Sequence, residues 1–111
     1  MAYDEELADR IRAVVAGEDG LEERRMFGGL AFLVHGHMAV AASGQGGLML
    51  RVDPADTGSL VDDHHVTRME MRARQMDGWL RVATEAVATD ETLAGWAGRG
   101  VAYVRTLPPK R

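Results

Sequence analysis

The feature that most constrains this chain is a pair of adjacent glycines, Gly28 and Gly29, followed at once by an unbroken apolar run. Glycine tolerates positive φ and close backbone approach, so the pair predicts a bend or bulge between two strands. The run from Leu30 to Val34 is too short for a typical helix and fits a buried strand. The preceding segment, Leu21 to Met26, then predicts the strand that enters the bend.

A three-residue turn of His35, Gly36 and His37 is predicted to lead into a further strand, from Met38 to Ser43. The resulting register collects large apolar side chains on one face of the sheet. Its facing pairs are Val34 with Met38, Phe32 with Val40, and Leu30 with Ala42. After a turn at residues 44–47, residues 48–52 continue this face, and we expect the helices to pack against it.

The opposite face of the same strands is smaller and flatter, but it is still largely apolar. An antiparallel sheet with one wet face normally alternates apolar with polar residues more cleanly. We therefore expect this second face to be covered, either by the chain itself or by another subunit, because exposed apolar patches mark partner sites. The candidate partner surface consists of Ala31, Leu33, Ala39, Ala41 and Met49. On this hypothesis, Leu33→Asp leaves a folded protein that no longer assembles.

Helical spacing of apolar residues predicts one helix at each end of the chain. The first covers residues 4–15, and the last begins at Thr89 or Asp90 and ends before Pro108. Glycines weaken an isolated helix by about 1 kcal/mol each relative to alanine, so we expect those of the last helix where it approaches another element. They are Gly95, Gly98 and Gly100.

The middle of the chain predicts one short helix and two further strands. Asp53 and Pro54 are typical of a helix start, which we place before Leu60. Residues 66–71 and 78–83 are expected to pair as strands around a turn that contains Asp77 and Gly78. Trp79 and Arg81 then share one face, and the alternation does not say which face is buried.

These segments together resemble the TfoX N-terminal domain family, the TfoX/Sxy group of bacterial proteins. The matching motif residues are Met26, Phe27, Gly28, Gly29, Gly78 and Trp79. The resemblance covers roughly residues 7–107 and implies a two-layer α+β domain. In some longer relatives, which carry a further C-terminal helical domain, it implies a role in regulating competence genes. The family has no catalytic residue set to carry across, so we predict neither an enzyme nor a cofactor.

The predicted fold class is α+β, with an antiparallel sheet of five to six strands packed in two layers against an N-terminal and a C-terminal helix. A chain of 111 residues with 46% hydrophobic content fits one domain over residues 1–111. The absence of cysteine excludes disulfides and thiolate sites. No apolar stretch approaches the roughly 20 residues of a spanning helix and the N-terminus is acidic, so we expect a cytoplasmic protein without membrane contact.

Four histidines raise the question of a metal site. His35 and His37 lie two residues apart, and the adjacent pair His64 and His65 follows two aspartates, Asp62 and Asp63. Zinc needs several ligands that converge at about 2 Å, and nothing in the sequence brings the two groups together. We predict no metal and interpret all four histidines as exposed turn residues. A small metal-binding or ligand-binding enzyme that uses these turns is the weakest hypothesis.

Basic side chains dominate the segment 66–82, although the chain carries a net charge of -4. The charge argues against non-specific nucleic-acid binding. Our interpretation of the arginines is a solvated strand face, and the alternative is a local patch for an anion or an acidic partner. The candidate patch consists of Arg68, Arg72, Arg74 and Arg81.

Two functional hypotheses therefore rank above the hypothesis of a small metal-binding or ligand-binding enzyme. The first is a non-enzymatic regulatory module that works through protein contacts or self-association as a homodimer. The second is a transcription accessory that touches nucleic acid through these arginines, and it requires salt-sensitive binding.

Overall fold

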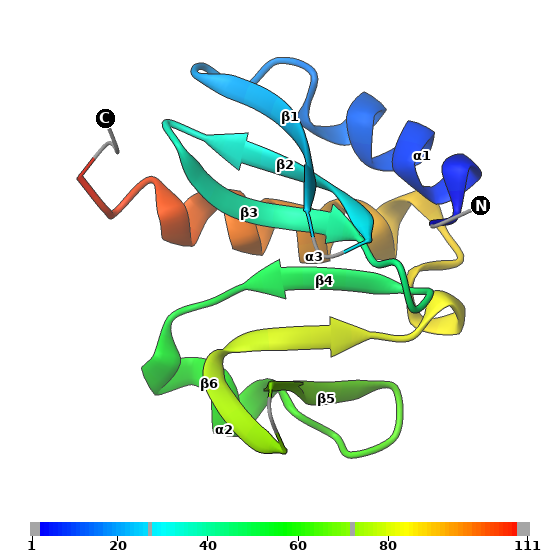
Figure 1. The fold of residues 1–111 in the computed structure, drawn as a ribbon, viewed down its shortest axis with the longest axis vertical. Helices are drawn as coiled ribbons and strands as arrows, with labels where there is room; N and C mark the ends of the chain where they lie inside the picture. The colour runs from blue at the N-terminus through cyan, green and yellow to red at the C-terminus, as the bar shows by residue number, and fades with distance from the viewer. Residues whose placement is uncertain (1–2, 27, 72, 109–111) are drawn as a thin grey trace.

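The computed structural model describes residues 3–26, 28–71 and 73–108. Within these residues, the chain forms one six-stranded antiparallel sheet with the strand order β1-β2-β3-β4-β6-β5. The strands are β1 (Leu21–Met26), β2 (Gly29–Val34), β3 (His37–Ala42), β4 (Leu48–Arg51), β5 (Val66–Met71) and β6 (Arg74–Val82). Figure 1 shows both long helices on one side of this sheet. The two-layer α+β prediction is confirmed.

The helices begin where side-chain oxygens cap them. The Asp4 carboxylate accepts a hydrogen bond from the Leu7 amide at the start of α1, and the Thr89 hydroxyl accepts one from Thr92 at the start of α3. Asp53 caps a short helical segment in the same way, through the amide of Ala55. The helical segments are α1 (Glu5–Val15), η1 (Pro54–Asp56), α2 (Thr57–Leu60), η2 (Thr84–Val87) and α3 (Asp90–Val104).

The main core lies between the sheet and the helices α1 and α3. Burial of each large apolar side chain contributes about 1.5–3 kcal/mol to folding. Leu80 and Val82 both belong to this core. The sequence did not decide which face of β6 packs against the helices, and the structure shows that it is the face of Leu80 and Val82. The largest fully buried side chains of the core include Phe32, Ile11, Leu48, Leu50, Leu80 and Leu93.

The β2–β3 turn is one residue shorter than predicted. His35 and Gly36 both adopt positive φ, at 51° and 86°, which is typical of a two-residue type I′ hairpin turn. Val34 therefore pairs with His37, and the predicted pairing with Met38 is wrong. A two-residue turn matches the right-handed twist of the strands, which favours it over the longer loop.

A bulge in β3 restores the predicted register beyond this turn. The register shifts between Phe32 and Leu33, so that Phe32 still pairs with Val40 as predicted. The shift exchanges the two residues of β3 that precede Val40. Ala39 packs in the helix-side core and Met38 packs on the other face, opposite to the prediction for both residues.

The β5–β6 turn also differs from the prediction. Asp77 and Gly78 lie inside β6, which begins at Arg74. Gly78 has a φ of 88° at a bulge, where its amide donates to the Thr57 hydroxyl and its carbonyl accepts from the Val52 amide. An Asp-Gly pair is compatible with the positive φ of a bulge as well as with that of a turn. The sequence analysis predicted a turn at this pair, and the structure has a bulge there.

Two glycine predictions concern close backbone approach. Gly28 has a φ of 75°, and a Cβ on Gly29 would overlap the carbonyl oxygen of Ala42, which confirms the bend at this pair. Phe27 of the same motif lies outside the described residues. In α3, a Cβ on Gly100 would overlap the Ala39 carbonyl of β3, whereas nothing lies within 4 Å of a Cβ on Gly95 or Gly98. The close-approach prediction therefore holds for Gly100 alone among the three.

Gly100→Ala is expected to destabilise the protein by about 1–3 kcal/mol, because the added methyl group meets backbone oxygen that cannot rotate away. The matched control is Gly98→Ala, which adds the same group in open space and is expected to stabilise the helix by about 1 kcal/mol. Urea unfolding of the two variants measures both effects. Equal shifts of the same sign would contradict the close packing of α3 on β3.

Candidate binding surface

The side of the sheet away from α1 and α3 carries a second, smaller apolar cluster. We call it the methionine face, and its floor consists of Ala31, Leu33, Met38, Ala41 and Met49. Ala39 of the predicted partner surface is absent from it because of the bulge in β3. Each floor residue is at most 5% exposed. The expectation that this face is covered is therefore correct.

The chain's own side chains supply this cover. Met26 of β1, Met69 of β5 and Trp79 of β6 pack against the floor while remaining half-buried themselves, and we call these three the rim. β1 and β5 are the two edge strands, so the sheet curls around the methionine face. Figure 1 shows β1 turned steeply relative to β3 and β4. The curvature of the sheet thus covers the methionine face, as the helices α1 and α3 cover the opposite face.

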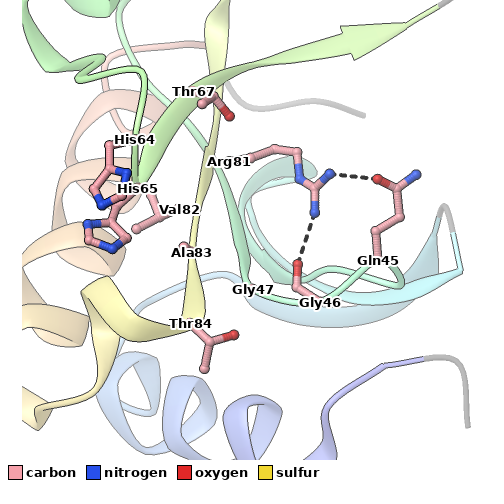
Figure 2. A pocket seen from close by; sticks show the side chains of 10 residues that line it. All are labelled: Gln45, Gly46, Gly47, His64, His65, Thr67, Arg81, Val82, Ala83 and Thr84. Atoms are coloured by element: carbon pink, nitrogen blue, oxygen red, sulfur yellow. Dashed lines mark hydrogen bonds between the residues drawn. The ribbon is translucent and has the colours of Figure 1, made fainter.

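Two hollows open beside this cluster. One, of about 380 Å³, is lined by both apolar and polar groups, which include Met49, Met69, Ser43, Glu70 and Arg81. The other, of about 310 Å³, lies at the adjoining end of the sheet, where the β3–β4 turn meets the end of β6 and the start of β5 (Figure 2). Arg81, Gln45 and Thr67 line both hollows. A positive charge therefore lies between a methionine-lined recess and a polar one.

Arg81 is held by neutral acceptors. Its guanidinium donates to the Gln45 side-chain oxygen at 2.6 Å and to the Gly46 carbonyl at 3.1 Å (Figure 2). Arg81 pairs with Met49 across β4 and β6, which places it on the methionine face. Among the described residues, no carboxylate lies within ion-pair distance of Arg81. Its charge is consequently available to a negative group that enters either hollow.

The structure does not gather the predicted arginine patch into one surface. Arg68 pairs with Leu80, a residue of the helix-side core, and its guanidinium lies beside Gly58 and bonds the Asp77 carboxylate at 2.8 Å. Arg74 is exposed at the first position of β6, and Arg81 lies on the methionine face. Arg72 is outside the described residues. Arg68 and Arg81 both line the hollow of about 380 Å³, whereas Arg74 is not among its lining residues.

The Trp79 ring is in contact with the guanidinium of Arg51, which also contacts Tyr103 of α3. The Arg51 guanidinium carbon lies 5.2 Å from the Trp79 ring centre and 5.7 Å from the Tyr103 ring centre. A cation held over aromatic rings at such distances is attracted by their negative faces. This contact links α3 to Trp79 of the rim and restricts the position of the indole.

The four histidines have unlike environments. His37 is only 8% exposed and its Nε2 lies 2.6 Å from the Pro108 carbonyl, so the prediction of an exposed turn residue is wrong for it. It fails because the shorter turn places His37 inside β3. His35 lies 3.7 Å from the Asp19 carboxylate. The rings of His64 and His65 lie 4.0 Å apart, on the opposite side of β6 from Arg81 in Figure 2.

The described parts of the chain bring together no group of three or more histidine, cysteine, aspartate or glutamate side chains that could hold a metal ion.

The loop before β5 is organised by one carboxylate. Asp62 accepts hydrogen bonds from the amides of His64, His65 and Val66 at 2.8 to 2.9 Å. These bonds, that from Val66 foremost, lower the pKa of the Asp62 carboxyl below its ordinary value because they favour its charged form. The turn beside the polar hollow is therefore fixed by a charged group.

Sequence reasoning missed Met38 of the floor and all three rim residues, Met26, Met69 and Trp79. Met38 was assigned to the other face because period-two alternation was counted through the bulge. Met69 keeps the alternation of β5, but residues 77–79 of β6 lie unpaired between the partners of Arg68 and Met69, Leu80 and Met76, so the sequence did not show what Met69 faces. The available signal was the spacing of methionines on strand segments, which favours an adaptable apolar surface.

These features define a two-layer α+β domain with one helix-covered face and one methionine-rich face. Comparison with protein families finds a match to the TfoX N-terminal domain over residues 13–103. The match covers most of the chain, which belongs to this family, and the resemblance drawn from its motifs is confirmed. Comparison with curated proteins finds no match, and neither does comparison with solved structures. Across the described residues, no helix is both long and apolar enough to cross a membrane.

Leu33 is expected to be a structural residue, which revises the outcome predicted from sequence. With 2% exposure, Leu33→Ala should cost about 2–5 kcal/mol of stability, since it leaves a cavity in the floor. Leu33→Asp should unfold the protein, because it buries an unpaired carboxylate. Chemical denaturation followed by circular dichroism measures both. A folded Leu33→Asp protein of nearly unchanged stability would contradict the burial of this face.

Asp62→Asn is expected to lower stability at neutral pH, because a neutral amide oxygen replaces a carboxylate that accepts three amide bonds. The folded-state pKa of Asp62 is depressed, so its contribution is present above the unfolded value near pH 4 and is lost as pH falls through the folded value. The stability difference between the two proteins should therefore shrink below about pH 4. Urea titrations across the acid range test this, and a difference independent of pH would refute it.

Proposed function

We propose that this chain is a non-enzymatic, regulatory protein-binding module of the TfoX N-terminal type, and that the methionine face is its binding surface. The single observation that carries the proposal is the rim: Met26, Met69 and Trp79 are half-buried over a fully buried apolar floor. Such side chains retain apolar area for a partner while the floor stays folded without one.

The composition of the rim supports this role. Methionine side chains are flexible and polarizable, so they adjust to the shape of an incoming group. Tryptophan, methionine and arginine are enriched at protein interfaces, and buried aromatic residues carry much of the binding energy. Trp79 is already held by Arg51, which reduces the ordering cost of binding.

The charge beside the rim favours a particular kind of partner. Arg81 lies between the two hollows and is bound only to the neutral groups of Gln45 and Gly46 among the described residues. A partner segment that places an apolar side chain against Met69 and an acidic side chain near Arg81 would satisfy both recesses. Complementary charge of this sort selects partners and speeds their encounter. Arg68 is already paired with the Asp77 carboxylate and Arg74 lies at the start of β6, away from the hollow of about 380 Å³, which speaks against a phosphate backbone as the main partner.

The variant Met69→Lys is expected to weaken partner binding at least about tenfold, because it places a hydrated charge in the rim. Ala94→Lys, at an exposed position of α3, is the matched control and should bind as the unaltered chain does. The chain and both variants serve as baits in lysate of the native host, with quantitative mass spectrometry as the readout. Partners retained equally by all three baits would refute the assignment of the surface.

Direct titration then follows with Trp96→Phe, which leaves Trp79 as the single tryptophan of the chain. Binding of the captured protein at the rim should shift the Trp79 emission. Binding without any change in this emission would place the contact elsewhere.

A further inference from the structure

The outer edge of β1 is a second surface that carries no neighbouring strand within residues 3–26, 28–71 and 73–108. Over these residues β1 pairs only with β2, and its pattern of exposure leaves Glu22, Glu23, Arg24 and Arg25 all exposed. An edge strand offers a row of unpaired amides and carbonyls that can bind another strand.

The outward-facing backbone groups of β1 follow from one hydrogen bond. The Gly20 carbonyl accepts from the His35 amide, so Gly20 belongs to a hydrogen-bonded pair just before β1. Such pairs recur every second residue in an antiparallel ladder. Glu22, Arg24 and Met26 therefore direct their backbone groups toward β2. The groups directed to the free edge are those of Leu21, Glu23 and Arg25.

The side chains of β1 divide between the two faces. Glu22 and Arg24 form an ion pair at 2.8 Å and stand opposite Leu33 and Ala31, on the methionine face. Leu21 and Glu23 stand on the helix side, where Glu23 bonds Arg12 of α1 at 2.7 Å. The Arg12 contact lowers the pKa of Glu23 through its hydrogen bond. Each face of the strand thus carries both signs of charge.

We propose that β1 binds β1 of a second copy of this chain, antiparallel and centred on Glu23, to form a continuous twelve-stranded sheet. A twofold axis perpendicular to the sheet keeps side chains on their own face, so facing residues must be an even number apart. Centring on Glu23 meets this condition and pairs Leu21 with Arg25. All three outward-facing residues then exchange backbone hydrogen bonds, about six in total.

Charge complementarity selects this occupant. In the proposed register, Glu22 of each copy faces Arg24 of the other, which gives two opposite-charge pairs on the methionine face. On the helix side the two Glu23 carboxylates meet at the axis, where each keeps its own Arg12 and has an Arg25 of the other copy diagonally opposite. A strand with charges of one sign would repel its own copy. In the order Glu-Glu-Arg-Arg, only the Glu23 carboxylates face a like charge, and each of them already has the Arg12 guanidinium of its own copy.

A register centred on Arg24 is the nearest competitor, and it is weaker. It would align only Glu23 and Arg25 for backbone bonding among the described residues of the strand, and it would place Arg24 against its own copy. Centring on Glu23 uses the whole length of β1. In one register Glu23 pairs with Glu23 of the other copy, and in the other register Arg24 pairs with Arg24, so a crosslink at either position distinguishes the two.

The test exchanges the charges between two variants. Glu22→Arg and Arg24→Glu each place like charges in both facing pairs of a homodimer, so each alone is expected to be a monomer by sedimentation velocity. Mixed in equal amounts, they should form a heterodimer of twice the monomer mass, because an arginine of the first variant then faces a glutamate of the second in both pairs. The double variant Glu22→Arg/Arg24→Glu should again form a homodimer. This double variant is the matched control: because it carries both substitutions, its dimerisation would show that neither substitution prevents folding.

The register is read by a cysteine, since the chain has none of its own. Glu23→Cys should crosslink to its own copy under mild oxidation, because directly paired residues lie about 5.5 Å apart, within disulfide range. Glu22→Cys and Arg24→Cys should not crosslink, because each would lie two residues out of register with itself. Crosslinking of Arg24→Cys instead of Glu23→Cys would overturn the register.

A monomeric mixture of the two charge variants, or an unaltered chain that remains monomeric at the highest concentration reached, would overturn the dimer. This outcome is distinguishable from failure of the proposed partner surface. Met69→Lys lies on β5, at the other edge of the sheet, and should leave the β1 dimer unchanged.

Discussion

The approach of α3 to β3 fixes how the two layers of this domain lie on each other. Gly100 brings the helix backbone against the Ala39 carbonyl, where a Cβ would not fit. Ala39 is the residue that the bulge in β3 turns toward the helices. Without the bulge, Met38 would point at the helix, and its longer side chain would hold α3 away from the sheet. One extra residue in β3 therefore sets the helix-to-sheet distance and the content of both faces.

The elements of this fold could be predicted because their signals are local. Asp4 and Asp53 cap helices by accepting hydrogen bonds from the amides of Leu7 and Ala55, a few residues further on, and the positive φ of Gly28 gives the bend. The predictions were wrong where one sequence pattern is compatible with two local structures. An Asp-Gly pair suits a turn and a bulge equally, and only the bonds from Gly78 to Thr57 and Val52, distant in sequence, decide between them.

The candidate binding surface could be predicted only in part. Four of its five predicted residues lie on the methionine face, because strand alternation is a local property. Its burial, by contrast, arises from curvature that brings Met26 and Met69, from opposite edges of the sheet, over one floor. No period in the sequence encodes that curvature. The arginines show the same limit, since Arg68 and Arg81 pair with residues of opposite faces, Leu80 and Met49, and yet line one hollow.

The two proposed surfaces have a geometric relation that follows from symmetry. A twofold axis perpendicular to the sheet carries each face of one copy onto the same face of the other, so a β1-centred dimer would present both methionine faces on one side. Two recesses on one rigid sheet would bind a partner with two suitable segments more tightly than either recess alone, because the second contact becomes intramolecular. A module of this size could then reach useful affinity from two modest sites. On this argument the edge strand would contribute to function through the geometry it imposes on the other surface.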